Sequence, residues 1–485
     1  MKKLSLLLVV LLCLAVMPLR TLLFESRSLK VVPAQALKID GKRVFLRLGK
    51  ALQYPTVSFP AAHSDATAEG RMAQLMDYLL RTFKPLEGRL KIERHPHNLV
   101  FRWEGKDPSL APLLLLAHLD VVPVDPETKD QWNYPPFSGA VSAGSIWGRG
   151  ALDNKNAAFA VLEAVEYMIS RNELPDRGVI IALGCDEEVG GERGAQQQAM
   201  RFREEGLAPF LILDEGFAVL DGVIDAVQAN VAGIGIAEKG YLTVELQVEQ
   251  TGGHASMPGP STSIGILAAA IARLEENPME ARIDGAVGLF FDELAREMPF
   301  EKKLLFANRW LLESFLVSEL EKQASTGATL RTTTAVTSTR GGIAENVLPE
   351  SAQATVNFRI HPRDTVESVL AHVRQTIADE RVKLVVLGAA SEPSAVSPAQ
   401  GAPWRLIEHT IRECFEGVIV APSLVLGATD SRHYAGLSEH VYRFTPMKLK
   451  PADLDRIHGI NERIPTGDYL DMIQFYVQLM RNGAK

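Results

Sequence analysis

The first half of the chain alternates short apolar runs with segments of helical periodicity. Residues 113–120 (LLLLAHLD) form a continuous apolar run that ends in polar residues, which is typical of a central parallel strand. Residues 154–172 repeat apolar side chains at helical spacing, and two more apolar runs follow at 179–183 and 209–216. Strands separated by helices predict an α/β fold with a mostly parallel sheet.

The pattern changes near Gly240. Residues 241–253 and 351–360 alternate apolar and polar side chains, as strands with one solvated face do. Helical stretches lie between them, so we expect an α+β domain inserted into the first domain. The α/β alternation is expected to resume after this insertion, for example in residues 366–388. The predicted segments are a leader (1–24), a stalk (25–50), the first part of the α/β domain (51–239), the inserted domain (240–362) and the second part of the α/β domain (363–485).

The amino terminus has the pattern of an export signal or signal anchor. Lys2 and Lys3 precede residues 4–19, in which Ser5 is the only polar side chain. We expect the leader to be retained as a membrane anchor or cleaved on secretion, with the main domains outside the cytoplasm. A buried amino-terminal helix is the alternative.

Composition narrows the classes of function. A net charge of −8 provides no basic surface for nucleic acid. The three cysteines form no CxxC pair, so neither a disulfide framework nor a thiolate zinc site is expected.

Candidate metal ligands follow three of the predicted strands. His118 and Asp120 end the first, Asp186-Glu187-Glu188 follow the second, and Asp214-Glu215 lie in the third. Asp153 precedes a helix in a glycine-rich loop, where a carboxylate taken alone is more often a helix cap. Because the carboxyl ends of parallel strands share one edge of a sheet, these groups are expected to converge. The carboxylates would repel one another there, so we expect them to bind a pair of divalent metal ions.

The motifs LLLAHLDVVPV, IWGRGALDNK, DEEVGG, LDEG and TGGHAS occur in order along the chain. Together they resemble the zinc-dependent aminoacylase and carboxypeptidase superfamily, in the branch of carboxypeptidase S and the N-fatty-acyl-amino-acid synthase/hydrolase. The resemblance covers about residues 50–480. It implies a di-zinc catalytic domain of the α/β class with an inserted α+β lid domain.

The resemblance also implies roles for individual residues. The implied zinc ligands are His118, Asp214, Glu188, a late histidine and a bridging Asp153. Two histidines near the carboxyl terminus are candidates for this last ligand. The His-Gly-x-x-Glu pattern favours His458, and His433 is the alternative. Glu187 resembles the general base, and Asp120 resembles the carboxylate that orients His118.

The inserted domain adds substrate contacts by the same resemblance. His254 in TGGHAS resembles an oxyanion donor. Asn346 and Arg359, with Arg432 from the α/β domain, resemble contacts to a substrate carboxylate, although a surface salt bridge is the alternative for Arg359. The resemblance leaves open whether His254 serves its own site or the partner's site in a homodimer.

The implied reaction is hydrolysis of the amide bond of N-acyl amino acids, with condensation in reverse. A carboxypeptidase or dipeptidase acting on short peptides is the alternative, because both substrates present an amide and a carboxylate. Residues 301–322 are strongly apolar and include Phe306, Trp310 and Phe315. They are interpreted as lid core, as the wall of an acyl site or as a membrane-facing patch.

Overall fold

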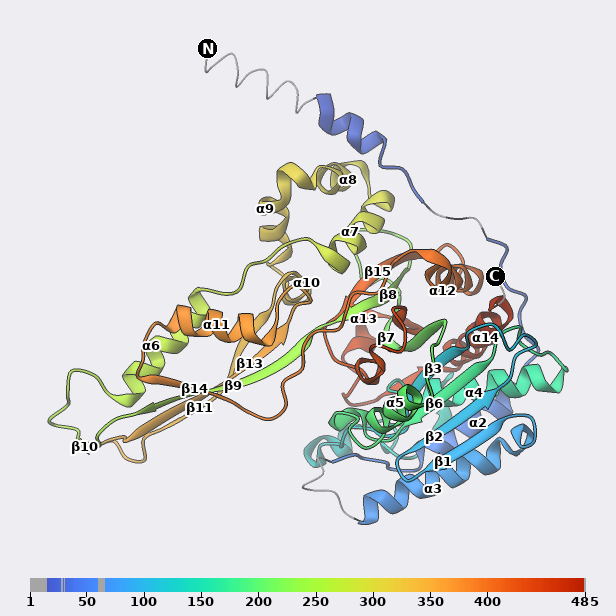
Figure 1. Ribbon diagram of the computed structural model, residues 1–485, viewed down its shortest axis with the longest axis horizontal. Helices are drawn as coiled ribbons and strands as arrows, with labels where there is room; N and C mark the ends of the chain where they lie inside the picture. Colours follow the sequence, from blue (N-terminus) through green and yellow to red (C-terminus); the bar gives the residue numbers. More distant parts are fainter. Residues whose placement is uncertain (1–14, 28, 30, 60–65, 484–485) are drawn as a thin grey trace.

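The computed structural model describes the whole chain except residues 1–14, 28, 30, 60–65 and 484–485. Residues 1–14 of the predicted leader therefore lie outside the described part. Figure 1 shows an α/β domain from which an elongated second domain projects. Across the described residues, no helix has both the length and the apolar character needed to cross a membrane.

The α/β domain is built on one eight-stranded sheet, which positions the candidate site. Its four adjacent strands β6, β3, β7 and β16 run parallel, while β1, β2 and β8 include antiparallel pairings. The predicted mostly parallel centre is thus confirmed. In spatial order the strands are β1 (Lys91–His95), β2 (Asn98–Trp103), β6 (Val179–Gly184), β3 (Leu113–His118), β7 (Leu211–Leu220), β16 (Val441–Leu449), β8 (Val231–Glu238) and β15 (Ile419–Val425).

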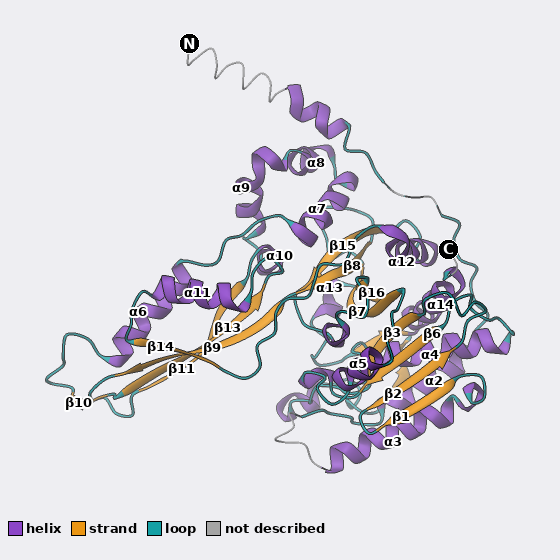
Figure 2. Ribbon diagram, in the orientation of Figure 1, coloured by secondary structure: helices purple, strands orange, loops and turns teal. Residues whose placement is uncertain are grey.

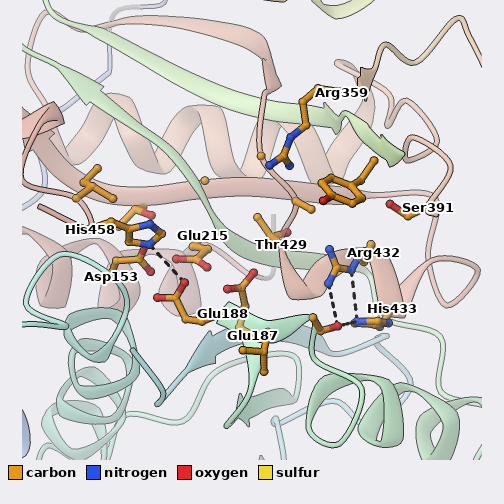
Figure 3. Close-up of a pocket in the computed structure, with 18 of the residues that line it drawn as sticks. Asp153, Glu187, Glu188, Glu215, Arg359, Ser391, Thr429, Arg432, His433 and His458 are labelled. Atoms are coloured by element: carbon orange, nitrogen blue, oxygen red, sulfur yellow. Dashed lines mark hydrogen bonds and ion pairs between the residues drawn. The ribbon is translucent and has the colours of Figure 1, made fainter. Parts of the chain in front are cut away.

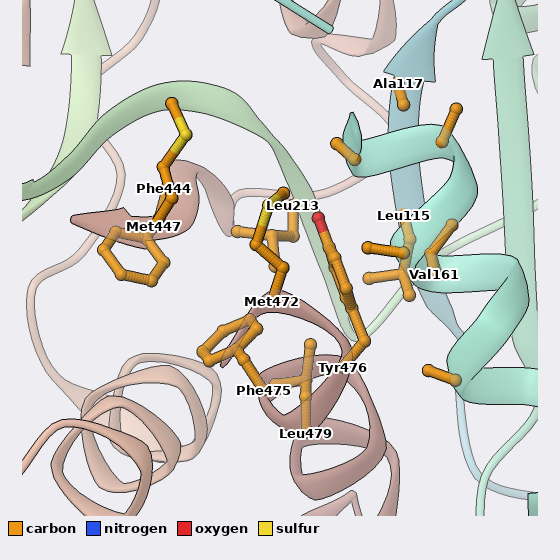
Figure 4. Packing of buried hydrophobic residues seen from close by; sticks show 14 of the residues in the cluster. Leu115, Ala117, Val161, Leu213, Phe444, Met447, Met472, Phe475, Tyr476 and Leu479 are labelled. Carbon is orange, nitrogen blue, oxygen red and sulfur yellow. The ribbon is translucent and has the colours of Figure 1, made fainter. Parts of the chain in front are cut away.

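Helices cover both faces of this sheet, because alternate strand residues point to opposite sides. Leu113, Leu115 and Ala117 of β3 pack into a large core with α4 and α14, whereas Leu114 and Leu116 pack into a smaller core with α5. Figure 4 shows the larger core between β3, α4 and α14. The helices of this domain are α2 (Gly41–Leu52), α3 (Ala66–Thr82), α4 (Lys155–Ser170), α5 (Ala195–Glu204), α12 (Gly401–Cys414), α13 (Pro451–Leu454) and α14 (Thr466–Asn482).

Short elements connect these layers. A three-stranded sheet joins a loop that precedes α4 to the segment that precedes α14. Its strands are β17 (Arg463–Pro465), β5 (Ser145–Trp147) and β4 (Ala140–Ser142). The short 3₁₀ helices are η2 (Lys84–Leu86), η3 (Pro126–Gln131), η4 (Glu187–Val189) and η5 (Asp430–Tyr434).

The lid domain is a four-stranded sheet with two helices on one face (Figure 2). Its elements are β11 (Thr333–Gly341), β13 (Ser351–Ile360), β9 (Gly240–Glu249), β14 (Val382–Val386), α6 (Ser263–Glu276) and α11 (Val366–Ile377), with the short ribbon β10 (Gly253–His254) and β12 (Val347–Leu348) at one end. Strand β14 pairs antiparallel with β9, so residues 366–386 belong to the lid. The structure therefore moves the second domain boundary from residue 362 to beyond Val386.

Four helices between the lid strands form a block that packs beside β15 and β8 rather than on the lid sheet. They are α7 (Gly285–Glu297), α8 (Phe300–Ala307), α9 (Arg309–Leu320) and α10 (Ala324–Leu330). We call α7–α10 the helical block. The described helix at residues 15–22 lies against it (Figure 1).

Candidate functional site

The carboxyl ends of β3 and β6 lie beside the middle of β7, where the candidate ligands gather. His118, the last residue of β3, is buried, and its Nε2 lies 2.9 Å from Asp153 Oδ1 and 3.2 Å from Glu215 Oε1. Glu187 completes a group with His118 and Glu215 whose ligand atoms lie within 4.8 Å of one another. Helix η4 after β6, strand β7 and the loop before α4 therefore each contribute a carboxylate to one cluster around a histidine.

His458 brings the carboxyl-terminal part of the chain to the same cluster. Its Nε2 lies 3.1 Å from Asp153 Oδ2 and 3.4 Å from Glu188 Oε2 (Figure 3). The two oxygens of Asp153 thus face different histidines, His118 and His458, which is the arrangement expected of a bridging carboxylate. His433 instead lies 2.8 Å from the carbonyl oxygen of Gly190, so the structure brings His458 and not His433 to the cluster.

The three consecutive acids after β6, Asp186, Glu187 and Glu188, make different contacts. Asp186 is turned away from the cluster, and its carboxylate accepts the backbone N–H groups of Arg193 and Gly194, each at 2.8 Å. Glu187 and Glu188 line the pocket. Gly190 and Gly191 follow with positive φ values, which a residue with a Cβ adopts at a cost, so the chain can turn sharply after η4.

Asp120 lies behind the cluster, in the position of an orienting carboxylate. Its Oδ1 is 3.3 Å from His118 Nδ1, and its two oxygens accept the backbone N–H groups of Glu187 and Glu188, each at 3.1 Å. Burial alone raises the pKa of Asp120, but these hydrogen bonds and His118 lower it overall. The buried carboxylate of Asp120 therefore fixes the position of the candidate ligand His118 relative to the backbone of Glu187 and Glu188.

The structure places Glu215, rather than the expected Asp214, against the cluster as the candidate ligand on β7. The Asp214 carboxylate accepts the backbone N–H groups of Ser431 at 2.7 Å and of Glu215 at 2.9 Å, and it is absent from the groups of candidate ligands among the described residues. Glu215 faces His118, and the side chain of Asn154 donates to its carboxylate. The two neighbouring acids therefore point to different partners.

The cluster carries more negative charge than its own side chains neutralise. Burial, and then the neighbouring Asp153, raise the pKa of Glu215 to about 8, and burial raises the pKa of Glu187 well above its usual range. The carboxylates of Asp153 and Glu188 accept hydrogen bonds from His458 and raise its pKa to about 10. Glu188 Oε1 is buried without a hydrogen-bond partner among the described residues. An unpaired buried carboxylate oxygen beside repelling acids fits a bound cation.

The donor set fits two metal ions. His118, Glu215 and one oxygen of Asp153 would hold one ion. His458, Glu188 and the other oxygen of Asp153 would hold the second. Nitrogen and oxygen donors of this kind are those of catalytic zinc sites.

Glu462 is a site residue that the sequence reasoning did not identify. Its carboxylate is fully buried, pairs with Arg149 at 2.7 Å, and accepts the backbone N–H groups of Gly150, Leu152 and Asp153 at 3.0, 2.8 and 3.3 Å. Arg149 also donates to the backbone oxygen of His458. The last residue of the His-Gly-x-x-Glu pattern therefore ties the loop of the bridging aspartate to the segment of the late histidine.

A pocket of about 980 Å³ opens over the cluster. Arg359 from the lid strand β13 and Arg432 from η5 both line it, so each domain supplies a guanidinium (Figure 3). Arg359 lies 4.9 Å from the centre of the Tyr241 ring, and Arg432 donates to the carbonyl oxygen of Gly190 at 2.8 Å. Apolar side chains complete the lining: Leu152, Val189, Met447, Leu449 and Ile457.

His254 and Asn346 do not reach this pocket. Both lie at the exposed end of the lid, where the backbone N–H of Ala255 donates to the backbone oxygen of Asn346 and His254 is paired with Val347. Figure 1 shows this end, marked by β10, pointing away from the α/β domain. The structure brings these two residues near each other, but not to the acidic cluster.

The apolar stretch 301–322 does not line the pocket either. Phe306 stacks on Phe291 with ring centres 5.1 Å apart, as core residues do, whereas Trp310 and Phe315 are about half exposed. The structure therefore gives no support to an acyl site in this stretch.

Comparison with known proteins agrees with this architecture. A model of peptidase family M20/M25/M40 matches residues 114–482. The chain is 42% identical over 448 residues to the N-fatty-acyl-amino acid synthase/hydrolase PM20D1 of Xenopus tropicalis, covering 91% of this chain and 86% of that protein. It is 31% identical over 486 residues to carboxypeptidase S of Saccharomyces cerevisiae, covering 90% and 83%.

Among solved structures, an M20 family metallo-carboxypeptidase from Sulfolobus solfataricus aligns with a TM-score of 0.65 at 21% identity, covering 91% of this chain and 99% of that one. Human carnosine dipeptidase 1 aligns with a TM-score of 0.61 at 17% identity, covering 92% and 96%. These likenesses confirm the fold. The match over residues 114–482, with the relatives that cover both domains, shows that the chain belongs to peptidase family M20/M25/M40.

Proposed function

We propose that this protein is a di-zinc hydrolase that cleaves the amide bond of N-acyl amino acids and forms it in reverse when concentrations favour condensation. One observation carries the proposal: a cluster of two histidines and four carboxylates shares a pocket with two guanidinium groups, Arg359 and Arg432. The relatives named N-fatty-acyl-amino acid synthase/hydrolase support the reaction class.

Zinc bound by these ligands would polarise the scissile carbonyl and lower the pKa of the attacking water toward about 7. Glu187 is the carboxylate of the acidic cluster to which this assignment gives no metal. It would accept the proton of the attacking water and donate it to the leaving nitrogen. Asp120 supports this role because it holds the backbone N–H of Glu187 in place.

The two guanidinium groups suit the free carboxylate of the product amino acid. An arginine binds a carboxylate through two parallel hydrogen bonds, and such a contact selects substrates that end in a carboxylate. Arg359 belongs to the lid and Arg432 to the α/β domain, so a bound carboxylate would bridge the two domains.

The apolar part of the pocket favours an acyl group over a peptidyl group. Met447, Leu449 and Ile457 lie together with His458 in the pocket lining and offer a hydrocarbon chain surface to contact. The second candidate is a carboxypeptidase or dipeptidase, which the relative named carboxypeptidase S favours.

A substrate panel tests this choice. With zinc present, kcat/KM is measured for N-acyl amino acids of two to eight acyl carbons and for dipeptides. Each buried methylene contributes up to about 0.8 kcal/mol, so kcat/KM should rise by roughly two to three orders of magnitude along the series. Ile457→Ala should flatten this rise, and the neighbouring control Ile460→Ala, which lies outside the pocket lining, should not. A flat profile with faster dipeptide cleavage would favour the peptidase.

We also propose that residues 1–24 keep the protein on a membrane, with both domains outside the cytoplasm. The basic residues Lys2 and Lys3 before an apolar run support this orientation. The full-length protein should stay in the membrane pellet after alkaline carbonate washing, and protease added outside spheroplasts should degrade it. Recovery in the soluble fraction would contradict retained anchoring.

A further inference from the structure

The described amino-terminal helix is attached to the helical block by its polar side. Arg20 Nε donates to the backbone oxygen of Ala307 at 2.8 Å, and Asn308 Nδ2 donates to the Met17 oxygen and to Thr21 Oγ1, each at 3.2 Å. Thr21 is only 1% exposed, and Asn308 is fully buried. Residues 17–21 are therefore held in a defined position on the protein.

The attachment continues along the next turn of chain. The ring of Phe24 lies 4.1 Å from the guanidinium of Arg296 on α7, and Arg296 also donates to the backbone oxygen of Glu25 at 2.9 Å. Phe24 packs against the buried cluster that includes Leu294 and Met298 of the helical block. The segment after the helix is thus part of the folded structure as well.

The outward side of the same helix is apolar. Leu19 and Leu22 of the helix are 58% and 67% exposed, and Leu23, which directly follows it, is 72% exposed. A helix on the surface of a water-soluble protein buries its apolar stripe and exposes its polar one. Here Leu19 and Leu22 are exposed together with Arg20 while the polar Thr21 is buried, so apolar side chains dominate the outward face.

The neighbouring helix α9 presents an exposed face of the same kind. Trp310, Leu311 and Phe315 are 56%, 47% and 51% exposed, and the other exposed positions of α9 are two serines, 314 and 318, and a glutamate, 319, at the end of the helix. Asn308, which binds Thr21, directly precedes α9, so α9 begins where the amino-terminal helix is attached. We call Leu19, Leu22, Leu23, Trp310, Leu311 and Phe315 the apolar platform.

The sequence before the amino-terminal helix indicates what contacts the apolar platform. Residues 4–14 (LSLLLVVLLCL) contain a single polar residue and continue directly into residue 15 of the helix that binds Asn308. A hydrophobic segment of this kind partitions into lipid. Since it is covalently continuous with the helix that carries Leu19 and Leu22, insertion of the leader brings lipid to this part of the platform.

We infer that the apolar platform lies against a lipid bilayer, with the rings of Trp310 and Phe315 inserted at the boundary between headgroups and acyl chains. Interfacial helices bury an apolar face about 5–10 Å deep in this way. The helical block would then dock on the membrane that the leader enters and give the α/β domain one fixed orientation above it. The inference rests on the proposed membrane attachment and is independent of the substrate.

Tryptophan fluorescence tests this directly, because of the five tryptophans only Trp310 is exposed; the other four, Trp103, Trp132, Trp147 and Trp404, are each at most 8% exposed. The full-length protein is reconstituted into phosphatidylcholine vesicles with or without brominated acyl chains. The emission of Trp310 is the difference between the unmodified protein and Trp310→Phe. Brominated lipid should quench this difference, while iodide in the surrounding water should not reach it.

Two results would overturn the inference. Quenching of Trp310 by aqueous iodide and not by brominated lipid would place the platform in water. Protection from both quenchers would place it in a protein contact, such as a second copy of this chain.

A matched pair of variants separates docking from anchoring. Leu311→Ser with Phe315→Ser should leave the protein bound to vesicles through its leader but restore iodide quenching of Trp310. Leu454→Ser, which alters an exposed leucine on α13, should change neither result. Unchanged lipid quenching in the double variant would also contradict the inference. Hydrolysis of a water-soluble N-acetyl amino acid, assayed on the same samples, tests the proposed enzymatic function separately.

Discussion

Asp214 and Glu215 are neighbours in the chain but bind different partners. Asp214 accepts the backbone N–H of Ser431 and so holds η5, the element that carries Arg432. Glu215 faces His118 at 3.2 Å. The direction of each side chain from its strand, rather than its residue type, separates a structural carboxylate from a candidate ligand.

Metal content should distinguish these two acids. Glu215→Gln should lower the zinc bound from about two ions per chain to about one, because a carboxamide is a poorer zinc ligand than a carboxylate. Asp214→Asn should retain both ions, since its amide oxygen can still accept the N–H of Ser431. Elemental analysis after dialysis measures both. Loss of zinc in Asp214→Asn with full content in Glu215→Gln would return the ligand role to Asp214.

Substitutions should also distinguish the roles of Glu187 and Glu188. Glu187→Gln keeps the shape of the side chain but cannot accept a proton, so kcat should fall by roughly 10²–10⁴-fold with zinc retained. Glu188→Gln should weaken metal binding instead, because Glu188 lies 3.4 Å from His458. Kinetics and metal analysis on the same preparations check this. Zinc loss confined to Glu187→Gln would mean that the two roles are reversed.

Lys239 makes stability depend on pH away from the metal cluster. Burial, and then Arg363 and Arg359, lower the pKa of this amine from 10.5 to about 7. The unfolded chain therefore binds more protons than the folded one between pH 7 and about 10, and the free energy of unfolding should rise with pH across this range, by up to about 1.4 kcal/mol per unit. Lys239→Met should flatten the rise in urea unfolding. An unchanged slope would show that Lys239 titrates normally in the fold.

At the scale of elements, the site depends on loops that other parts of the chain hold in place. The loop before α4 carries Asp153, and the segment before β17 carries His458. Glu462 joins the two through Arg149 and three backbone N–H groups. Distant ligands can share a metal site because a buried ion pair fixes the distance between their loops.

Glu462→Gln should therefore disturb both stability and metal binding. It leaves the buried Arg149 without its charge partner, which costs about 3–5 kcal/mol of unfolding free energy. Glu173→Gln is the control, since the Arg481–Glu173 pair is about one third exposed and should cost about 0–1 kcal/mol. Urea unfolding and metal analysis report the two effects. Equal costs in both variants would contradict the role given to Glu462.

At the scale of the whole molecule, the expected oxyanion donor and the acidic cluster lie in different places. His254 is exposed at the end of the lid, while the pocket is lined by the base of the lid and the α/β domain. If His254 acts in catalysis, the lid must rotate toward its own domain or enter the site of a second copy.

Mixing two inactive variants distinguishes these routes. His254→Ala and Glu187→Gln, unfolded together and refolded as a mixture, should regain about a quarter of full activity if a dimer supplies His254 in trans, because one intact site forms in each mixed pair. Rotation of the lid in cis should restore none. Sedimentation of the mixture checks that dimers form.

The chain by itself determined the order of strands and helices in the first domain and the convergence of acids at its strand ends. Continuous apolar runs such as 113–117 are typical of buried strands, and parallel strands place their carboxyl ends together. The ordered motifs also indicated the family. These conclusions needed only local pattern and the general geometry of parallel sheets.

Three features were decided only by the tertiary structure. They are which acid of a neighbouring pair faces the cluster, where the lid domain ends, and which faces of the helical block are buried. The direction of Glu215 depends on strand register, and β14 belongs to the lid because it pairs with β9, which lies far earlier in the chain. The exposure of Trp310 depends on which faces of α9 its neighbours bury. Each of these results comes from contacts between distant segments, and a local pattern of polar and apolar residues does not contain them.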